Sequence, residues 1–140
     1  FQGRWRTTAL ITTATDGLHR NFTQRVELFG SIWGRRCQSC DACDCSCGGP
    51  QRPDLVWPGG QIRRDVAAQA YRLIQGAQVA ILIGEACVQS NLLELVKAQC
   101  GLLRLALVPG PRPAWADAHL PGSCEEVLRA LAQETSTFLP

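Results

Sequence analysis

A run of five apolar residues, Val79 to Ile83, constrains the fold more than any other segment of the sequence. The run is continuous and ends at Gly84, a pattern typical of a central parallel strand that is buried on both faces. Segments typical of strands alternate with segments of helical periodicity along the chain. The expected strands are residues 9–15, 26–30, 79–83 and 103–108, and the expected helices are residues 61–75, about 90–100 and 124–133. This alternation predicts an α/β fold with a parallel sheet and crossover helices.

Length and composition restrict the class of protein further. With 140 residues and 46% apolar content, the chain suits one globular domain, residues 1–140. The 14 basic and 12 acidic residues are scattered, which argues against a nucleic-acid partner. No apolar run approaches the roughly 20 residues that a membrane-spanning helix needs, so we expect no direct membrane span. We expect residues 135–140 to form a surface tail.

Five of the eight cysteines are crowded into a segment of eleven residues. They are Cys37, Cys40, Cys43, Cys45 and Cys47. Such crowding favours a metal site over a disulfide framework. The Gly and Pro residues that follow predict that residues 37–60 form an irregular, cysteine-rich insertion. The other three, Cys87, Cys100 and Cys124, have apolar neighbours, and we expect them to be reduced and buried.

Several segments, in the same order, resemble the sirtuins, a family of NAD-dependent protein deacylases with a Rossmann domain and a small zinc module. Residues 11–20, ITTATDGLHR, resemble the family's ITQNxDGLHR, and residues 27–31, ELFGS, resemble its ELHGS. Residues 47–57, 77–84 and 117–131 resemble later family segments. The resemblance covers nearly the whole chain and implies an incomplete Rossmann-like parallel sheet with a reduced zinc-type module.

The departures from the family pattern fall on residues that carry its chemistry. Phe29 stands where the family has a histidine general base, and phenylalanine cannot accept a proton. Thr13 and Ala14 replace the family's Gln and Asn, which contact the cofactor ribose and the attacking water. The carboxylate of Glu85 would repel a phosphate at the turn after Gly84. These departures from the family pattern imply a pseudoenzyme, that is, a family member without catalytic activity, which does not bind NAD. We expect Phe29 to be buried in the vacated site.

Asp16 is retained from the family motif, where it faces the nicotinamide pocket. This makes Asp16 a candidate cofactor-binding residue, although an aspartate after a strand is also typical of a helix N-cap.

Zinc is the metal that the resemblance implies for the cysteine-rich segment. Cys37 and Cys40 form the first C-x-x-C pair, and Cys47 ends the second pair with Cys45 as its nearest companion. Alternatively, Cys43 in place of Cys45 would complete the C-x2-C-x2-C-x3-C spacing of an iron–sulfur cluster. A segment without metal, or with a disulfide, is the third possibility.

The family's Gly-rich GAGxS turn and the strand before it have no counterpart in the sequence. The chain is thus expected to lack the N-terminal Gly-rich nucleotide-binding half and to have another protein subunit complete its sheet. We interpret it as a structural or assembly subunit of a larger complex. The alternatives are a regulatory module that binds NAD or ADP-ribose, and a deacylase completed by a partner chain. Reduced cysteines indicate an intracellular protein, and a start without Met is compatible with a cleaved mitochondrial import peptide.

Overall fold

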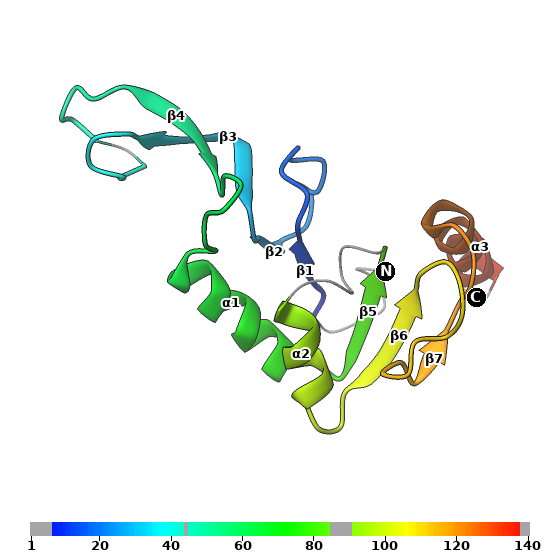
Figure 1. Cartoon of the computed structure of the whole chain (residues 1–140). Coiled ribbons are helices and arrows are strands. Elements are labelled where there is room, and N and C mark those ends of the chain that lie inside the picture. The colour runs from blue at the N-terminus through cyan, green and yellow to red at the C-terminus, as the bar shows by residue number, and fades with distance from the viewer. Residues whose placement is uncertain (1–6, 44, 85–90, 138–140) are drawn as a thin grey trace. The chain divides into compact units, whose positions relative to one another are not determined.

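The computed structural model describes residues 7–43, 45–84 and 91–137. The chain divides into two compact units, Phe1–Leu73 and Ile74–Pro140, and the boundary falls within helix α1 (Arg64–Gln75). Figure 1 shows the elements of both units. Each unit contains its own parallel strand pairing, which confirms the α/β class.

The first unit begins with two parallel strands, β1 (Ala9–Thr12) and β2 (Gln24–Glu27). Their register places Ala9 beside Gln24 and Thr12 beside Glu27. Val26 and Leu28 are each only 2% exposed, and the backbone N–H of Leu28 donates to the carbonyl of Thr12 over 2.9 Å. Burial of these two apolar side chains stabilises the short sheet.

An antiparallel hairpin of β3 (Gly30–Cys37) and β4 (Gln51–Leu55) follows, with an irregular register between Ser31 and Arg35. The hairpin corrects one expectation, since β4 lies within the segment 37–60 that was predicted to be irregular. The sequence of β4, QRPDL, contains proline and charged residues, which weaken the strand signal. Pairing with β3 overrides that weak local preference.

Helix α1 confirms the predicted helix 61–75, although its first residue is Arg64. Asp65 lies in its first turn, where a carboxylate interacts favourably with the helix dipole. Ala70 and Ile74 are buried, at 0% and 7% exposure. The helix thus has the amphipathic pattern that the sequence indicates.

The second unit contains a three-stranded parallel sheet in the order β5 (Val79–Ile83), β6 (Leu103–Leu107) and β7 (Ala118–His119). Two helices accompany it, α2 (Asn91–Ala98) and α3 (Cys124–Thr137). The Arg104 side chain donates to the carbonyls of Val96, Lys97 and Gln99, so β6 holds the end of α2. The predicted strands and helices of this unit are confirmed, while β7 was not predicted because two residues give no periodic signal. Helix α3 also extends into the predicted tail, through Thr137.

Several predicted burials are wrong. The parallel strand β5 was expected to be buried on both faces, yet Ile81 is 38% exposed, as is Ile83, and the neighbouring Leu103 is 47% exposed. The described part of the chain leaves these side chains partly uncovered. Cys100, which follows α2, is exposed, and Cys124, the first residue of α3, is half-buried, whereas Cys87 lies outside the described residues.

Among the described residues, no helix combines the length and the apolar character that crossing a bilayer requires.

Candidate metal centre and the adjoining pocket

Four cysteine thiols come together in the loop between β3 and β4. The sulfurs of Cys37, Cys40, Cys45 and Cys47 all lie within 4.8 Å of one another. The Sγ of Cys47 lies 3.4 Å from those of Cys37 and Cys45 and 3.7 Å from that of Cys40. Thiolates about 2.3 Å from a tetrahedral zinc ion lie about 3.8 Å apart. The donor set and its spacing therefore fit zinc, and its four sulfurs would form a closed, structural site.

The backbone of the loop places these thiols. Strand β3 ends at the fully buried Cys37, whose carbonyl accepts from the N–H of Asp41 over 3.0 Å and whose N–H donates to Ala42. Asp41 has a φ of 56°, a left-handed conformation that aspartate tolerates better than most residues. A Cβ on Gly49 would come within 2.8 Å of the Cys37 sulfur, so only glycine allows the returning chain to approach this closely.

The pKa values of Cys37 and Cys47 are shifted in opposite directions. The pKa of Cys37 is lowered to about 6, chiefly because the backbone N–H of Cys40 donates to its sulfur. At Cys47 the backbone N–H of Gly49 lowers the pKa, but the thiols of Cys37, Cys45 and Cys40 outweigh it and raise the pKa to about 12. Crowded thiols cannot all ionise without a cation, and a bound metal would supply that charge.

The structure separates the zinc set from the iron–sulfur set. The four thiols that it gathers are the predicted zinc ligands, whereas Cys43 lies outside the group. The Cys43 sulfur instead accepts from Nη2 of Arg36 over 3.5 Å. The spacing Cys37, Cys40, Cys43 and Cys47 is thus not assembled as one site, and the described cysteines are all free thiols.

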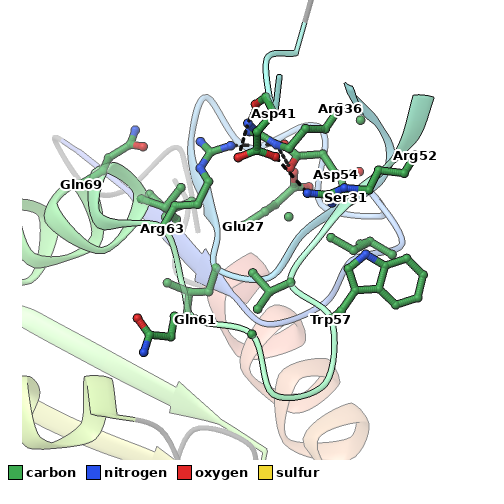
Figure 2. A pocket seen from close by; sticks show the side chains of 18 of the residues that line it. Glu27, Ser31, Arg36, Asp41, Arg52, Asp54, Trp57, Gln61, Arg63 and Gln69 are labelled. Carbon is green, nitrogen blue, oxygen red and sulfur yellow. Dashed lines mark hydrogen bonds and ion pairs between the residues drawn. The ribbon is translucent and has the colours of Figure 1, made fainter. Parts of the chain in front are cut away.

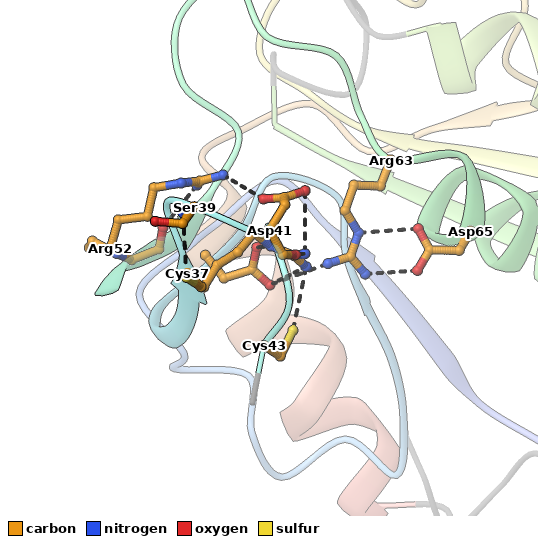
Figure 3. A network of polar contacts seen from close by, with 10 residues as sticks. Cys37, Ser39, Asp41, Cys43, Arg52, Arg63 and Asp65 are labelled. Carbon is orange, nitrogen blue, oxygen red and sulfur yellow. Dashed lines mark hydrogen bonds and ion pairs between the residues drawn. The ribbon is translucent and has the colours of Figure 1, made fainter. Parts of the chain in front are cut away.

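A chain of ion pairs extends from the cysteine loop to helix α1, as Figure 3 shows. We call it the ion-pair chain, and its members in order are Asp41, Arg36, Asp54, Arg63 and Asp65. Arg36, whose side chain is 10% exposed, binds Asp54 with Nε at 2.7 Å and Nη2 at 3.3 Å. It also donates to the Asp41 carbonyl. Arg63 Nη1 lies 3.4 Å from Oδ2 of Asp54, the oxygen that Arg36 Nη2 also contacts, and Arg63 binds Asp65 through two nitrogens.

Electrostatics fix the charge states in this chain. Hydrogen bonds from the Arg36 guanidinium hold the pKa of Asp54 below its ordinary value. The same contact raises the pKa of Arg36, and Asp65 has a lowered pKa because Arg63 donates to it. Asp54 is therefore charged at neutral pH and balances a nearly buried arginine.

Four members of the ion-pair chain, all but Asp65, line one wall of a pocket of about 500 Å³ in the first unit (Figure 2). Apolar groups from Val26, Leu28, Leu55 and Val56 also line it, together with Trp57 and Gln61. Arg52 closes the wall beside Asp41, with Nη2 3.0 Å from the carboxylate. Sequence reasoning missed this site, because Arg36 and Asp54 are 18 residues apart and no short motif joins them.

The other predicted site residues lie elsewhere. Asp16 is exposed, and its carboxylate accepts from the N–H of Leu18 over 2.9 Å, so it forms an Asx turn rather than a helix N-cap. The Asp16 carbonyl accepts from the indole of Trp33. Thr13 and Ala14 are half-buried in the adjoining segment. Phe29 is 36% exposed, so its predicted burial is wrong, and the turn containing Glu85 lies outside the described residues.

Comparison with known proteins gives related sequences and structures, although no family model matches the chain. NAD-dependent protein deacylase 1 of Caldanaerobacter subterraneus is 30% identical over 86% of this chain and 57% of its own length. The protein of the same name from Archaeoglobus fulgidus is 31% identical over 93% of this chain and 61% of its own length. A crystal structure of a Sir2 homologue in complex with NAD shares 30% identity and a TM-score of 0.76, covering 93% of this chain and 59% of that one.

The fold and the thiol group together define an α/β domain with parallel strands and a candidate metal-binding module between β3 and β4. The chain is a sirtuin-like domain. It spans about three fifths of the length of the curated relatives that it matches first, at 57% and 60%.

The expectation that the chain is not an enzyme is wrong, because its relatives are named as NAD-dependent protein deacylases. That expectation was drawn from Phe29, Thr13 and Ala14, from Glu85 at the turn after Gly84, and from the missing Gly-rich turn. An active site is assembled from several segments, and departures in some of them do not determine what the remaining segments contribute. The chain covers only part of its relatives, so its residues do not show the whole site.

Proposed function

We propose that this chain is part of an NAD-dependent protein deacylase, which removes acyl groups from lysine side chains. The similarity to deacylases along 86% to 93% of the chain carries this proposal. A closed four-thiol metal site inserted in a parallel α/β domain supports it, as a structural module rather than a catalytic metal.

Within this function the residues of the chain have limited roles. Cys37, Cys40, Cys45 and Cys47 hold a structural zinc ion, and the pocket beside them is shaped by the ion-pair chain. Phe29 cannot act as a general base. We therefore propose that the proton acceptor and the phosphate-binding turn come from polypeptide outside residues 1–140, on the same or on a partner chain.

A deacylation assay tests the function. The complete protein, purified with zinc, is incubated with NAD and an acetyl-lysine peptide, and mass spectrometry follows the loss of the acetyl group. The proposal predicts NAD-dependent loss, with none when NAD is omitted. If NAD binds but neither the acetyl group is lost nor nicotinamide is released, the deacylase proposal is contradicted and a regulatory binding role is favoured.

We also propose that further polypeptide covers the sheet of the second unit. In the β5–β6 register Ile81 lies beside Leu105, two residues along from the Val79–Leu103 pair, so Ile81 and Leu103 share one face. Both are large apolar side chains, with 38% and 47% exposure. We propose that the portion of the sirtuin fold that this chain does not span supplies the apolar surface that covers these two side chains.

Substitution of Ile81 tests this covering. In the complete protein, Ile81→Asp should lower the free energy of unfolding by about 2 kcal/mol or more, because it would bury an unpaired charge. Leu18→Asp is the matched control, since Leu18 is 79% exposed and should tolerate the change. Urea denaturation measures both. Equal, small effects at the two positions would show that Ile81 stays open to solvent.

The intracellular and mitochondrial location expected from the sequence stays a prediction, which fractionation of the source cells would test.

A further inference from the structure

The cysteine loop and helix α1 are connected by polar contacts without a break. Asp41 lies directly after the thiol ligand Cys40, and its backbone N–H bonds the carbonyl of another ligand, Cys37. Any ion that fixes these two cysteines therefore fixes Asp41 as well. Its carboxylate lies 3.0 Å from Arg52 and 3.6 Å from Arg36.

Arg36 links the position of Asp41 to that of Asp54 on β4. Among the described residues it is the charged side chain with the least exposure, at 8% for the whole residue. It binds Asp41 on one side and Asp54 on the other, through separate nitrogens. A guanidinium held in this way cannot follow one partner without leaving the other.

The last link reaches the first turn of α1. Arg63 binds Asp54 with its side chain, and its carbonyl accepts the N–H of Ala67 over 2.9 Å. Its Nε and Nη2 bind the carboxylate of Asp65 at 3.1 Å and 2.8 Å. The start of the helix thus depends on the position of Arg63, and Val66 and Gln69 of this region line the pocket.

We propose that metal binding at the four cysteines controls the first turn of α1 and the shape of the pocket, through the ion-pair chain. With metal bound, Asp41 holds Arg36 and the chain stays closed. Without metal, the loop releases Asp41, and the helix start and pocket wall loosen. This inference rests on the metal centre of the proposed function but does not require deacylase activity.

Amide hydrogen exchange of residues 67–70, with and without zinc, tests the coupling in the complete protein. In the wild type, removal of zinc by a chelator should accelerate exchange there by about fivefold or more. Arg63→Gln breaks the last link at a side chain that is 39% exposed, so the variant should fold. In this variant exchange should be fast with zinc bound and should no longer respond to the chelator.

Coupling between two sites is reciprocal, so the same variant must also change the metal affinity. Competition with a chromophoric chelator should show that Arg63→Gln binds zinc about fivefold more weakly, although the side chain of Arg63 binds Asp54 and Asp65 rather than a cysteine. The control Glu125→Gln removes the ion pair with Arg129 on α3 and should match the wild type. The coupling would be overturned if the exchange rate of the wild type did not change when zinc is removed. It would also be overturned if Arg63→Gln bound zinc as tightly as the wild type does. A wild type that binds no zinc would overturn the metal centre itself.

Discussion

Cys43 and Cys45 are two residues apart, yet only Cys45 joins the thiol group. The loop turns so that Cys43 points to Arg36, while Cys45 approaches Cys47 to 3.4 Å. Spacing alone allowed both the zinc set and the iron–sulfur set. Which of the two sets is assembled depends on the left-handed turn at Asp41 and on the close return of the chain at Gly49. The number of residues between the cysteines does not reveal either feature.

Serine variants at these two positions should behave differently. Cys45→Ser should weaken zinc binding by about 100-fold or more, because a hydroxyl is a far poorer ligand than a thiolate. Cys43→Ser should keep one zinc ion per chain with nearly unchanged affinity. Chelator competition measures both, and the absorption spectrum of the cobalt-substituted protein reports the sulfur count. Equal losses in the two variants would mean that the ligand set is wrong.

Among the elements, the hairpin β3–β4 has the largest effect on the site. It carries Arg36 and Asp54 on neighbouring strands and places Cys37 at the mouth of the loop, with Arg36 directly opposite Arg52 in the register. Neither strand was predicted with its correct bounds. The strands and helices of the second unit, apart from the two-residue β7, were predicted well in position, since apolar runs and helical periodicity are local signals. Cross-strand ion pairs are long-range contacts and leave no such signal.

The Arg36–Asp54 pair should make the hairpin sensitive to acid. Because the folded-state pKa of Asp54 is lowered, its contribution is fully present above the unfolded value of about 3.9 and is lost as pH falls below it. Asp54→Asn should lower the free energy of unfolding by about 2–3 kcal/mol at pH 7, because it leaves Arg36 without its main partner.

Urea denaturation between pH 3 and pH 7 measures this contribution. The difference between wild type and Asp54→Asn should shrink toward pH 3, whereas Glu125→Gln, at an exposed pair on α3, should change stability little at any pH. A difference that stays constant with pH would show that the pair does not carry the effect.

For the whole molecule, the sequence predicted the fold class and the four metal-site candidates, because short motifs and apolar periodicity carry them. The inference of inactivity was wrong because it treated a few substituted positions as the complete site, while the chain spans only 57% to 61% of its deacylase relatives. The exposure of Ile81 and Leu103 also escaped prediction, since periodicity indicates that a strand is apolar but not what covers it.

The proposed metal centre and its coupling to α1 both depend on one metal ion held by four cysteines within a sirtuin-like domain. X-ray absorption at the zinc edge of the purified, complete protein tests this most directly. We expect a first shell of sulfur scatterers only, equivalent to four per zinc at about 2.3 Å, with one zinc per chain. A shell with nitrogen or oxygen ligands, or iron in place of zinc, would contradict the proposed four-cysteine zinc site.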